Sequence, residues 1–144
     1  MIMPDVNVLV YAHRTEYAQH EVARKFLEKC IQSGEAVGIT PLVAGGFVRV
    51  VTSSKIHAVP TSLEMALLVI DSLVTEHRGL WVSGREQHWN LVKTLASAAR
   101  SRGPDFTDAQ HAAIAIENGA TWASFDRGFD RFVPIGLRFN CLSS

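Results

Sequence analysis

The sequence predicts an α/β fold, a three-layer α/β/α sandwich around a short and mainly parallel sheet. Short apolar, β-prone segments alternate with longer segments in which apolar residues recur at helical spacing. Strands separated by helices favour parallel pairing, because a helical crossover returns the chain to the same end of the sheet. The chain has 144 residues, of which 47% are hydrophobic. This length and composition predict one domain over 1–144 with one core.

The first half of the chain alternates in this way. Thr40 with Pro41 is typical of a helix start, since threonine caps the first turn and proline suits the first helical position. Thr61 and Glu64 have the spacing of a capping box. The predicted elements are a strand over 2–4, a buried helical turn over 6–12, a helix over 21–31, a strand over 36–39, and helices over 40–52 and 61–74.

The second half repeats the pattern. Thr107 and Gln110 form a second capping-box spacing, and Asn118-Gly119 is a typical helix end. The predicted elements are a strand over 79–83, a helix over 85–101, a helix over 108–118, and strands over 121–125 and 136–139. The three tryptophans lie on these periodic segments, so we expect all of them in the core: Trp81, Trp89 and Trp122.

Charge and cysteine content bound the function. Lysine plus arginine total 14 and aspartate plus glutamate total 14, which excludes nucleic-acid binding by bulk charge alone. Cys30 and Cys141 have no zinc-site spacing, and two cysteines are too few for a disulfide scaffold. The start of the chain lacks signal-peptide features, and its apolar runs are far shorter than the ~20 residues of a membrane span. We therefore expect a cytoplasmic protein that is not embedded in a membrane.

Three aspartates lie at positions where the loops at the carboxyl ends of the strands of an α/β sheet are expected. Asp5 follows the first strand, Asp108 opens a helix and Asp126 follows a late strand. Carboxylates that meet at this edge repel one another and need a cation, and oxygen ligands favour Mg²⁺ or Mn²⁺. Such an ion lowers the pKa of an attacking water and polarises a phosphodiester. A purely structural role is the alternative, because aspartate is also favourable in a first helical turn and after a strand.

Three neighbours of these aspartates are ambiguous. Asn7 can orient a carboxylate or form an Asx-turn, and Ser124 can hydrogen-bond a metal ligand or merely fill its strand. His111 lies one helical turn after Asp108, so it is either a phosphate contact or a helix residue at the surface or half-buried. The basic residues form two modest clusters, Arg49 with Lys55 and Arg127 with Arg131.

Several segments together resemble a known family. They are residues 4–12 (PDVNVLVYA), 46–52 (GFVRVVT), 107–109 (TDA), 112–115 (AAIA), 118–121 (NGAT) and 124–129 (SFDRGF). In this order they resemble a PIN-domain protein, and more narrowly a VapC-type ribonuclease toxin of a bacterial type II toxin–antitoxin system, over nearly the whole chain. By this resemblance Asp5, Asp108 and Asp126 take the places of the family's first, third and fourth acidic residues.

The resemblance also implies an activity and partners. It implies an endoribonuclease that depends on Mg²⁺ or Mn²⁺, cleaves structured RNA such as tRNA, forms a homodimer and is held inactive by a cognate VapB-type antitoxin. Two positions that are commonly acidic in the family are glycine here, Gly46 and Gly128, with Asp105 and Asp130 nearby. A glutamate at position 46 is expected to tighten metal binding and to keep or raise stability, because glycine is unfavourable in a helix interior.

Two other functions compete with this one. A PIN fold without catalysis would act as an RNA-binding or protein-interaction module, and the glycines at positions 46 and 128 are the reason to consider it. A phosphatase of another α/β class would use Asp5 as nucleophile. That class wants a second aspartate as acid/base where Asn7 stands, so the sequence disfavours it.

Overall fold

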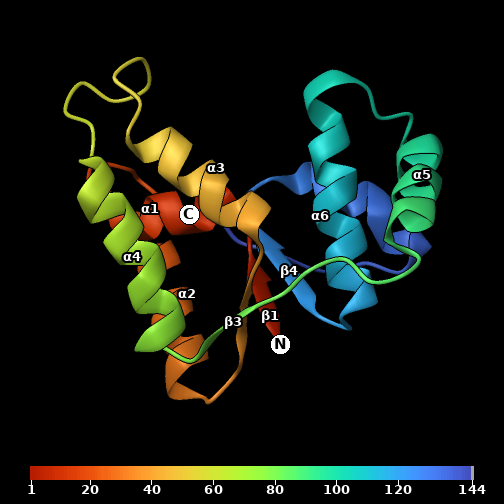
Figure 1. The fold of residues 1–144 in the computed structure, drawn as a ribbon, viewed down its shortest axis with the longest axis horizontal. Helices are drawn as coiled ribbons and strands as arrows, with labels where there is room; N and C mark the ends of the chain where they lie inside the picture. Colours follow the sequence, from red (N-terminus) through yellow and green to blue (C-terminus); the bar gives the residue numbers. More distant parts are fainter. Residues whose placement is uncertain (144) are drawn as a thin grey trace.

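The computed structural model describes residues 1–143, and its strands form one five-stranded sheet in the order β3-β2-β1-β4-β5 (Figure 1). All four strand pairings are parallel. The strands are β1 (Ile2–Pro4), β2 (Val37–Ile39), β3 (Gly79–Trp81), β4 (Thr121–Ser124) and β5 (Arg138–Cys141). The predicted α/β class and parallel sheet are confirmed. The last strand lies two residues later than predicted, because Gly136 has a φ of 120° and belongs to the turn before it.

The helices form two groups. They are α1 (Val6–His13), α2 (His20–Gln32), α3 (Pro41–Val51), α4 (Leu63–Thr75), α5 (His88–Ala99) and α6 (Phe106–Glu117), with short 3₁₀ segments η1 (Gly103–Asp105) and η2 (Arg127–Ile135). In Figure 1, α1 to α4 gather on one side of the sheet and α5 and α6 on the other. The predicted three layers are therefore present. None of the helices within residues 1–143 is both long enough and apolar enough to cross a membrane.

Both predicted capping boxes are wrong in detail. Ser62, not Thr61, caps α4, and its hydroxyl accepts a hydrogen bond from the Met65 amide at 3.1 Å. The Thr61 hydroxyl is engaged elsewhere, within 3.0 Å of the His13 ring. Helix α6 begins at Phe106 without a side-chain cap, so Thr107 lies inside its first turn. The 3₁₀ turn η1 runs directly into α6, which replaces the expected cap.

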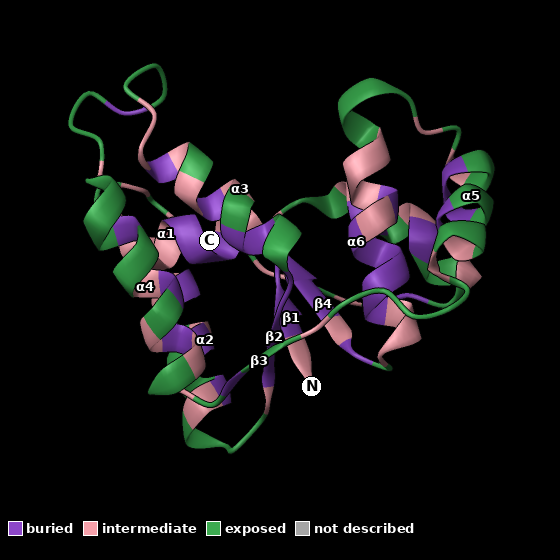
Figure 2. Ribbon diagram, in the orientation of Figure 1, coloured by how far each residue is buried: buried purple, intermediate pink, exposed green. Residues whose placement is uncertain are grey.

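The core lies between the sheet and the helices that cover it (Figure 2). Trp122 on β4 is fully buried, as predicted. The same prediction is wrong for Trp81 and Trp89, whose exposed fractions are 52% and 58%. Trp81 ends β3, an edge strand, and Trp89 lies in the first turn of α5, the outer of the two helices in the smaller group (Figure 1).

The parallel sheet places Asp5 and Asp126 at the same end of the sheet, where β1 and β4 terminate. Strands β1 and β4 are adjacent and run in the same direction, so both end at the edge that lies between the two helix groups (Figure 1). The Asp5 amide donates to the Ala123 carbonyl at 2.8 Å, which ties the end of β1 to the end of β4. Asp5 caps α1 and Asp126 caps η2. The helical segment that follows each of these two strands therefore begins at an aspartate.

Candidate active site

Asp5 is the most buried of the three aspartates, with an exposed fraction of 9%. One carboxylate oxygen accepts a hydrogen bond from the Val6 amide at 2.7 Å, and the other accepts from the Ser124 hydroxyl at 2.6 Å. The pKa of Asp5 is nevertheless raised from 3.8 to about 6, mainly by burial and to a smaller extent by the charges of Asp108 and Asp126. The charges of Asp108 and Asp126 therefore act on the Asp5 carboxylate at this end of the sheet.

Ser124 and Asn7 fix the orientation of this carboxylate. The Ser124 hydroxyl donates to Asp5 and accepts from the Asn7 side-chain amide at 3.1 Å and from the Asp126 amide at 2.9 Å. The Asn7 side-chain oxygen accepts from the Phe125 amide at 3.3 Å. The structure thus supports the first alternative for each residue, since both orient the candidate ligand. The network uses every hydrogen-bonding site of the serine hydroxyl.

Asp108 and Asp126 are more accessible. An oxygen of Asp126 accepts from the Gly128 amide at 2.8 Å, and the carboxylate faces solvent. Asp108 is half-buried in the first turn of α6, where burial raises its pKa. The guanidinium of Arg131 opposes that effect, because it lies 2.9 Å from the Asp108 carboxylate. The neutralising arginine was not expected from the sequence, which showed Arg131 only as part of a basic cluster.

The donor chemistry of this edge fits a hard divalent cation. Asp5 is buried and forms no ion pair with any residue in 1–143, and two further carboxylates raise its pKa. Within residues 1–143, however, no three His, Cys, Asp or Glu side chains are gathered closely enough to form a ready-made metal cage. The residues therefore fit an ion such as Mg²⁺, which keeps several waters and takes one or two protein carboxylates.

The two glycines that stand at commonly acidic positions of the family have different surroundings. A Cβ on Gly46 would lie 2.8 Å from a methyl group of Val6, the residue after Asp5. A Cβ on Gly128 would lie 2.8 Å from the Arg131 guanidinium and 3.0 Å from an Asp126 oxygen. Gly128 therefore lies beside the Asp126 carboxylate, whereas the space at Gly46 is taken by the side chain of Val6. Asp105 and Asp130, the nearby acids, are both exposed.

His111 does not contact the site edge. It is buried, and its ring stacks on Trp122 with the centroids 4.8 Å apart and the planes at 21°. Burial lowers its pKa to about 4, so the ring is neutral at pH 7. Both alternatives that the sequence suggested, a phosphate contact and a half-buried or surface residue, are wrong. The stacking partner is on a strand and lies outside the helical pattern that placed His111 near Asp108.

A family model for the PIN domain matches residues 2–133. Ribonuclease VapC43 of Mycobacterium tuberculosis is 42% identical to the chain over 132 residues, which cover 92% of this chain and 90% of that relative. The chain belongs to the PIN-domain family. Its likeness to VapC43 places it among the VapC-type members, as the sequence motifs predicted.

Solved structures show the same fold in VapC proteins. VapBC2 from Rickettsia felis, bound to a DNA fragment from its promoter, superposes with a TM-score of 0.70 at 19% identity and covers 99% of this chain and 100% of that chain. VapC20 of Mycobacterium tuberculosis, a toxin that cleaves the sarcin-ricin loop, gives a TM-score of 0.62 at 15% identity, covering 90% and 93%. These likenesses show that this VapC-type chain shares the PIN fold.

Proposed function

We propose that this VapC-type protein is a metal-dependent endoribonuclease and the toxin component of a toxin–antitoxin system, acting as one domain over 1–144 in the cytoplasm. The single observation that carries the proposal is the buried carboxylate of Asp5, held by Ser124 and coupled to Asp108 and Asp126 at one sheet edge. Its relatives are named VapC ribonucleases, which supports hydrolysis of RNA as the reaction. Structured RNA such as tRNA is the proposed substrate.

The chain's own residues have distinct roles in this proposal. Asp5, Asp108 and Asp126 hold Mg²⁺ or Mn²⁺, which when bound supplies a water of lowered pKa and charge stabilisation for the phosphate. Ser124 and Asn7 keep the Asp5 carboxylate in one orientation through their hydrogen bonds. The exposed Asp126 is the carboxylate most open to RNA.

Arg131 accounts for how the site tolerates its own charge. Its guanidinium pairs with Asp108 and also donates to the Gly128 carbonyl at 2.5 Å. An internal cation beside one carboxylate lowers the repulsion among the three before a metal binds. The same guanidinium is a phosphate-binding group by chemistry, so it suits the site when RNA arrives.

The proposed partners are a VapB-type antitoxin and a second copy of this chain in a homodimer. Structures with this fold include complexes named VapBC from Rickettsia felis. Helix α4 carries apolar side chains that stay exposed, among them Leu63, Leu67 and Leu68 at 59%, 48% and 59%. Such a face is typical of a protein–protein contact.

The experiment is an RNA cleavage assay with bulk tRNA from the host as substrate. We expect cleavage with Mn²⁺ or Mg²⁺, none with chelator, and a loss of at least about 100-fold in Asp5→Asn, since positioned charge and metal-activated water typically supply that much. Thermal unfolding of the variant shows whether it is folded. RNA binding without cleavage under any metal would overturn the proposal and support a non-catalytic PIN-fold binding module.

A further inference from the structure

A cavity of about 280 Å³ opens directly beside Asp5. It is lined by Asp5, Val6, Asn7, Val10, Tyr11, Tyr17 and Val50. Valine side chains and two tyrosine rings make most of this lining, and the Asp5 carboxylate is its one charged group. An apolar cavity of this kind, with a few polar groups at one side, is typical of a site for a flat organic ring.

The aromatic wall is held in place by its surroundings. The ring centroid of Tyr11 lies 4.8 Å from that of Tyr17 and 5.2 Å from that of Phe125. The Tyr17 hydroxyl donates to a ring nitrogen of His57 at 2.7 Å, and the other ring nitrogen donates to the Val50 carbonyl at 3.2 Å. His57 is buried, and through these two contacts it ties Tyr17 to the last turn of α3. The wall is therefore formed before any ligand binds.

Tyr11 connects this wall to the carboxylates. Burial raises the pKa of its hydroxyl, and the neighbouring Tyr17 and Asp5 add to the effect. The hydroxyl makes no hydrogen bond to any side chain or carbonyl in the described part of the chain, and the residue is only half-buried. Tyr11 thus offers a ring face and a free polar group within electrostatic reach of Asp5.

We propose that this cavity binds one unstacked nucleobase of the RNA, next to the phosphate that is cleaved. The inference rests on the proposed ribonuclease function and assigns it a base-binding subsite. Unstacked bases in RNA loops are recognised by stacking on aromatic side chains.

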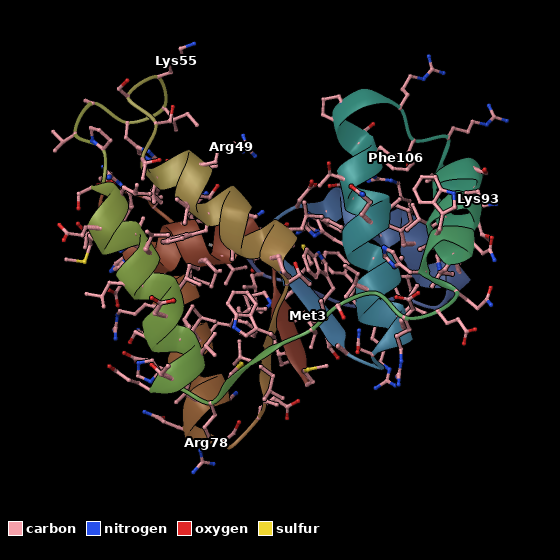
Figure 3. All side chains as sticks on the ribbon, in the orientation of Figure 1. Met3, Arg49, Lys55, Arg78, Lys93 and Phe106 are labelled. Atoms are coloured by element: carbon pink, nitrogen blue, oxygen red, sulfur yellow. The ribbon has the colours of Figure 1, made fainter. Side chains whose placement is uncertain are left out.

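The polarity of the cavity lining favours entry of the base over entry of the phosphate. The cavity is lined mostly by tyrosine and valine side chains, which suit a neutral, flat base better than a charged and hydrated phosphate. Arg49 is exposed on α3, next to Val50, and extends away from the helix into solvent (Figure 3). A base in the cavity leaves the phosphate backbone outside it; Arg49 lines the groove between α3 and α4 and is not part of this cavity.

The test compares two RNA ligands with the same backbone charge. One is a single-stranded oligouridylate of about ten nucleotides, and the other is the same backbone with abasic riboses. Binding is measured by fluorescence anisotropy with chelator present, so that cleavage plays no part. We expect the wild type to prefer the uridine ligand by about tenfold or more, the effect of one base on one aromatic ring.

The variants separate the ring from the fold. Tyr11→Leu should lose most of that preference while its affinity for the abasic backbone stays the same, and Tyr11→Phe, the matched control, should keep it. Val50→Phe fills the cavity and leaves both tyrosines in place, so it should lose the preference even if Tyr11→Leu fails to fold. An equal preference in wild type, Tyr11→Leu and Val50→Phe overturns the subsite and leaves the ribonuclease proposal intact. A wild type that binds neither ligand and cleaves no RNA overturns both.

Discussion

Asp5 and His111 are buried groups whose pKa values move in opposite directions. The pKa of Asp5 is raised from 3.8 to about 6, so the metal-free folded state binds a proton before the unfolded chain does. Its stabilising contribution is therefore present below pH 3.8 and is lost as pH rises through 6. The pKa of His111 is lowered from 6.5 to about 4, so its contribution is present above pH 6.5 and is lost as pH falls through 4.

Between pH 4 and 6.5, the unfolding free energy of the wild type loses the Asp5 contribution and gains the His111 contribution as pH rises. Each contribution is roughly 3 kcal/mol, from 1.36 kcal/mol per pKa unit, so the two pH dependences nearly cancel. We expect Asp5→Asn, in chelator, to lose unfolding free energy more steeply than wild type as pH falls through this range. His111→Phe, which keeps a ring against Trp122, should instead become more stable toward pH 4. Urea unfolding at several pH values measures both slopes. Three parallel curves would contradict the assignment.

The pair between Arg131 and Asp108 competes with a metal for the same carboxylate. Because the pair is partly exposed, we expect Arg131→Gln to lower the unfolding free energy by no more than about 1 kcal/mol. The same change frees the Asp108 carboxylate, so Mn²⁺ should bind up to about fivefold more tightly by calorimetry, the equivalent of that energy. Arg127→Gln is the matched control, since this exposed arginine of the same segment makes no ion pair within residues 1–143. Equal affinities in both variants would show that the pair does not restrain the site.

At the scale of the element, helix α3 contains two adjacent glycines with different surroundings. A Cβ on Gly45 meets nothing within 4 Å, whereas a Cβ on Gly46 would lie 2.8 Å from Val6. We expect Gly45→Ala to raise the unfolding free energy by about 0.5–1 kcal/mol, the helix-propensity gain. Gly46→Ala should lower it, because α3 must move away from α1. Thermal unfolding checks both, and a gain in both variants would mean that α3 does not pack closely at Gly46.

The close contact at Gly46 changes the expectation from the sequence that a glutamate there keeps or raises stability. The propensity gain is real, but the side chain has to displace Val6. The Val6→Ala background makes room, and in it we expect Gly46→Glu to bind Mn²⁺ more tightly than Gly46→Gln, which adds the same volume without charge. Calorimetric titration compares the two. Equal affinities would mean that residue 46 does not face the carboxylates, and the alignment of residues 46–49 would have to be abandoned.

At the scale of the whole molecule, the local sequence pattern predicted the order of strands and helices and the features that follow from that order. The alternation of strand and helix gave the parallel sheet, and the sheet brought Asp5 and Asp126 to one edge. The arginine on Asp108 and the hydrogen bond of Tyr17 to His57 join residues 23 and 40 positions apart. No helical or strand period encodes such pairs. Trp81 was misplaced for a related reason, since whether a strand lies at the sheet edge is a property of the topology.

Assembly is the remaining property of the whole molecule, and helix α4 predicts it. Cavities of about 460 Å³ flank this helix on both sides. One lies against α2 and includes Leu68, and the other lies against α3 and includes Leu67 and Trp81. The outer residues of α4 are exposed along its length (Figure 2). A helix that is apolar on nearly all sides is unfavourable in water unless another chain covers it.

We therefore expect a homodimer at high micromolar concentration, or a stable complex when the antitoxin is co-expressed. Leu67→Glu and Leu68→Glu each place a charge on one flank, so at least one of them should shift the mass toward the monomer or release the antitoxin. Glu64→Gln, an exposed change on the same helix, should do neither. Light scattering measures the mass. A monomeric wild type with no recovered partner would contradict the prediction, and so would two glutamate variants with wild-type assembly, because the exposed apolar face of α4 would then not be an interface.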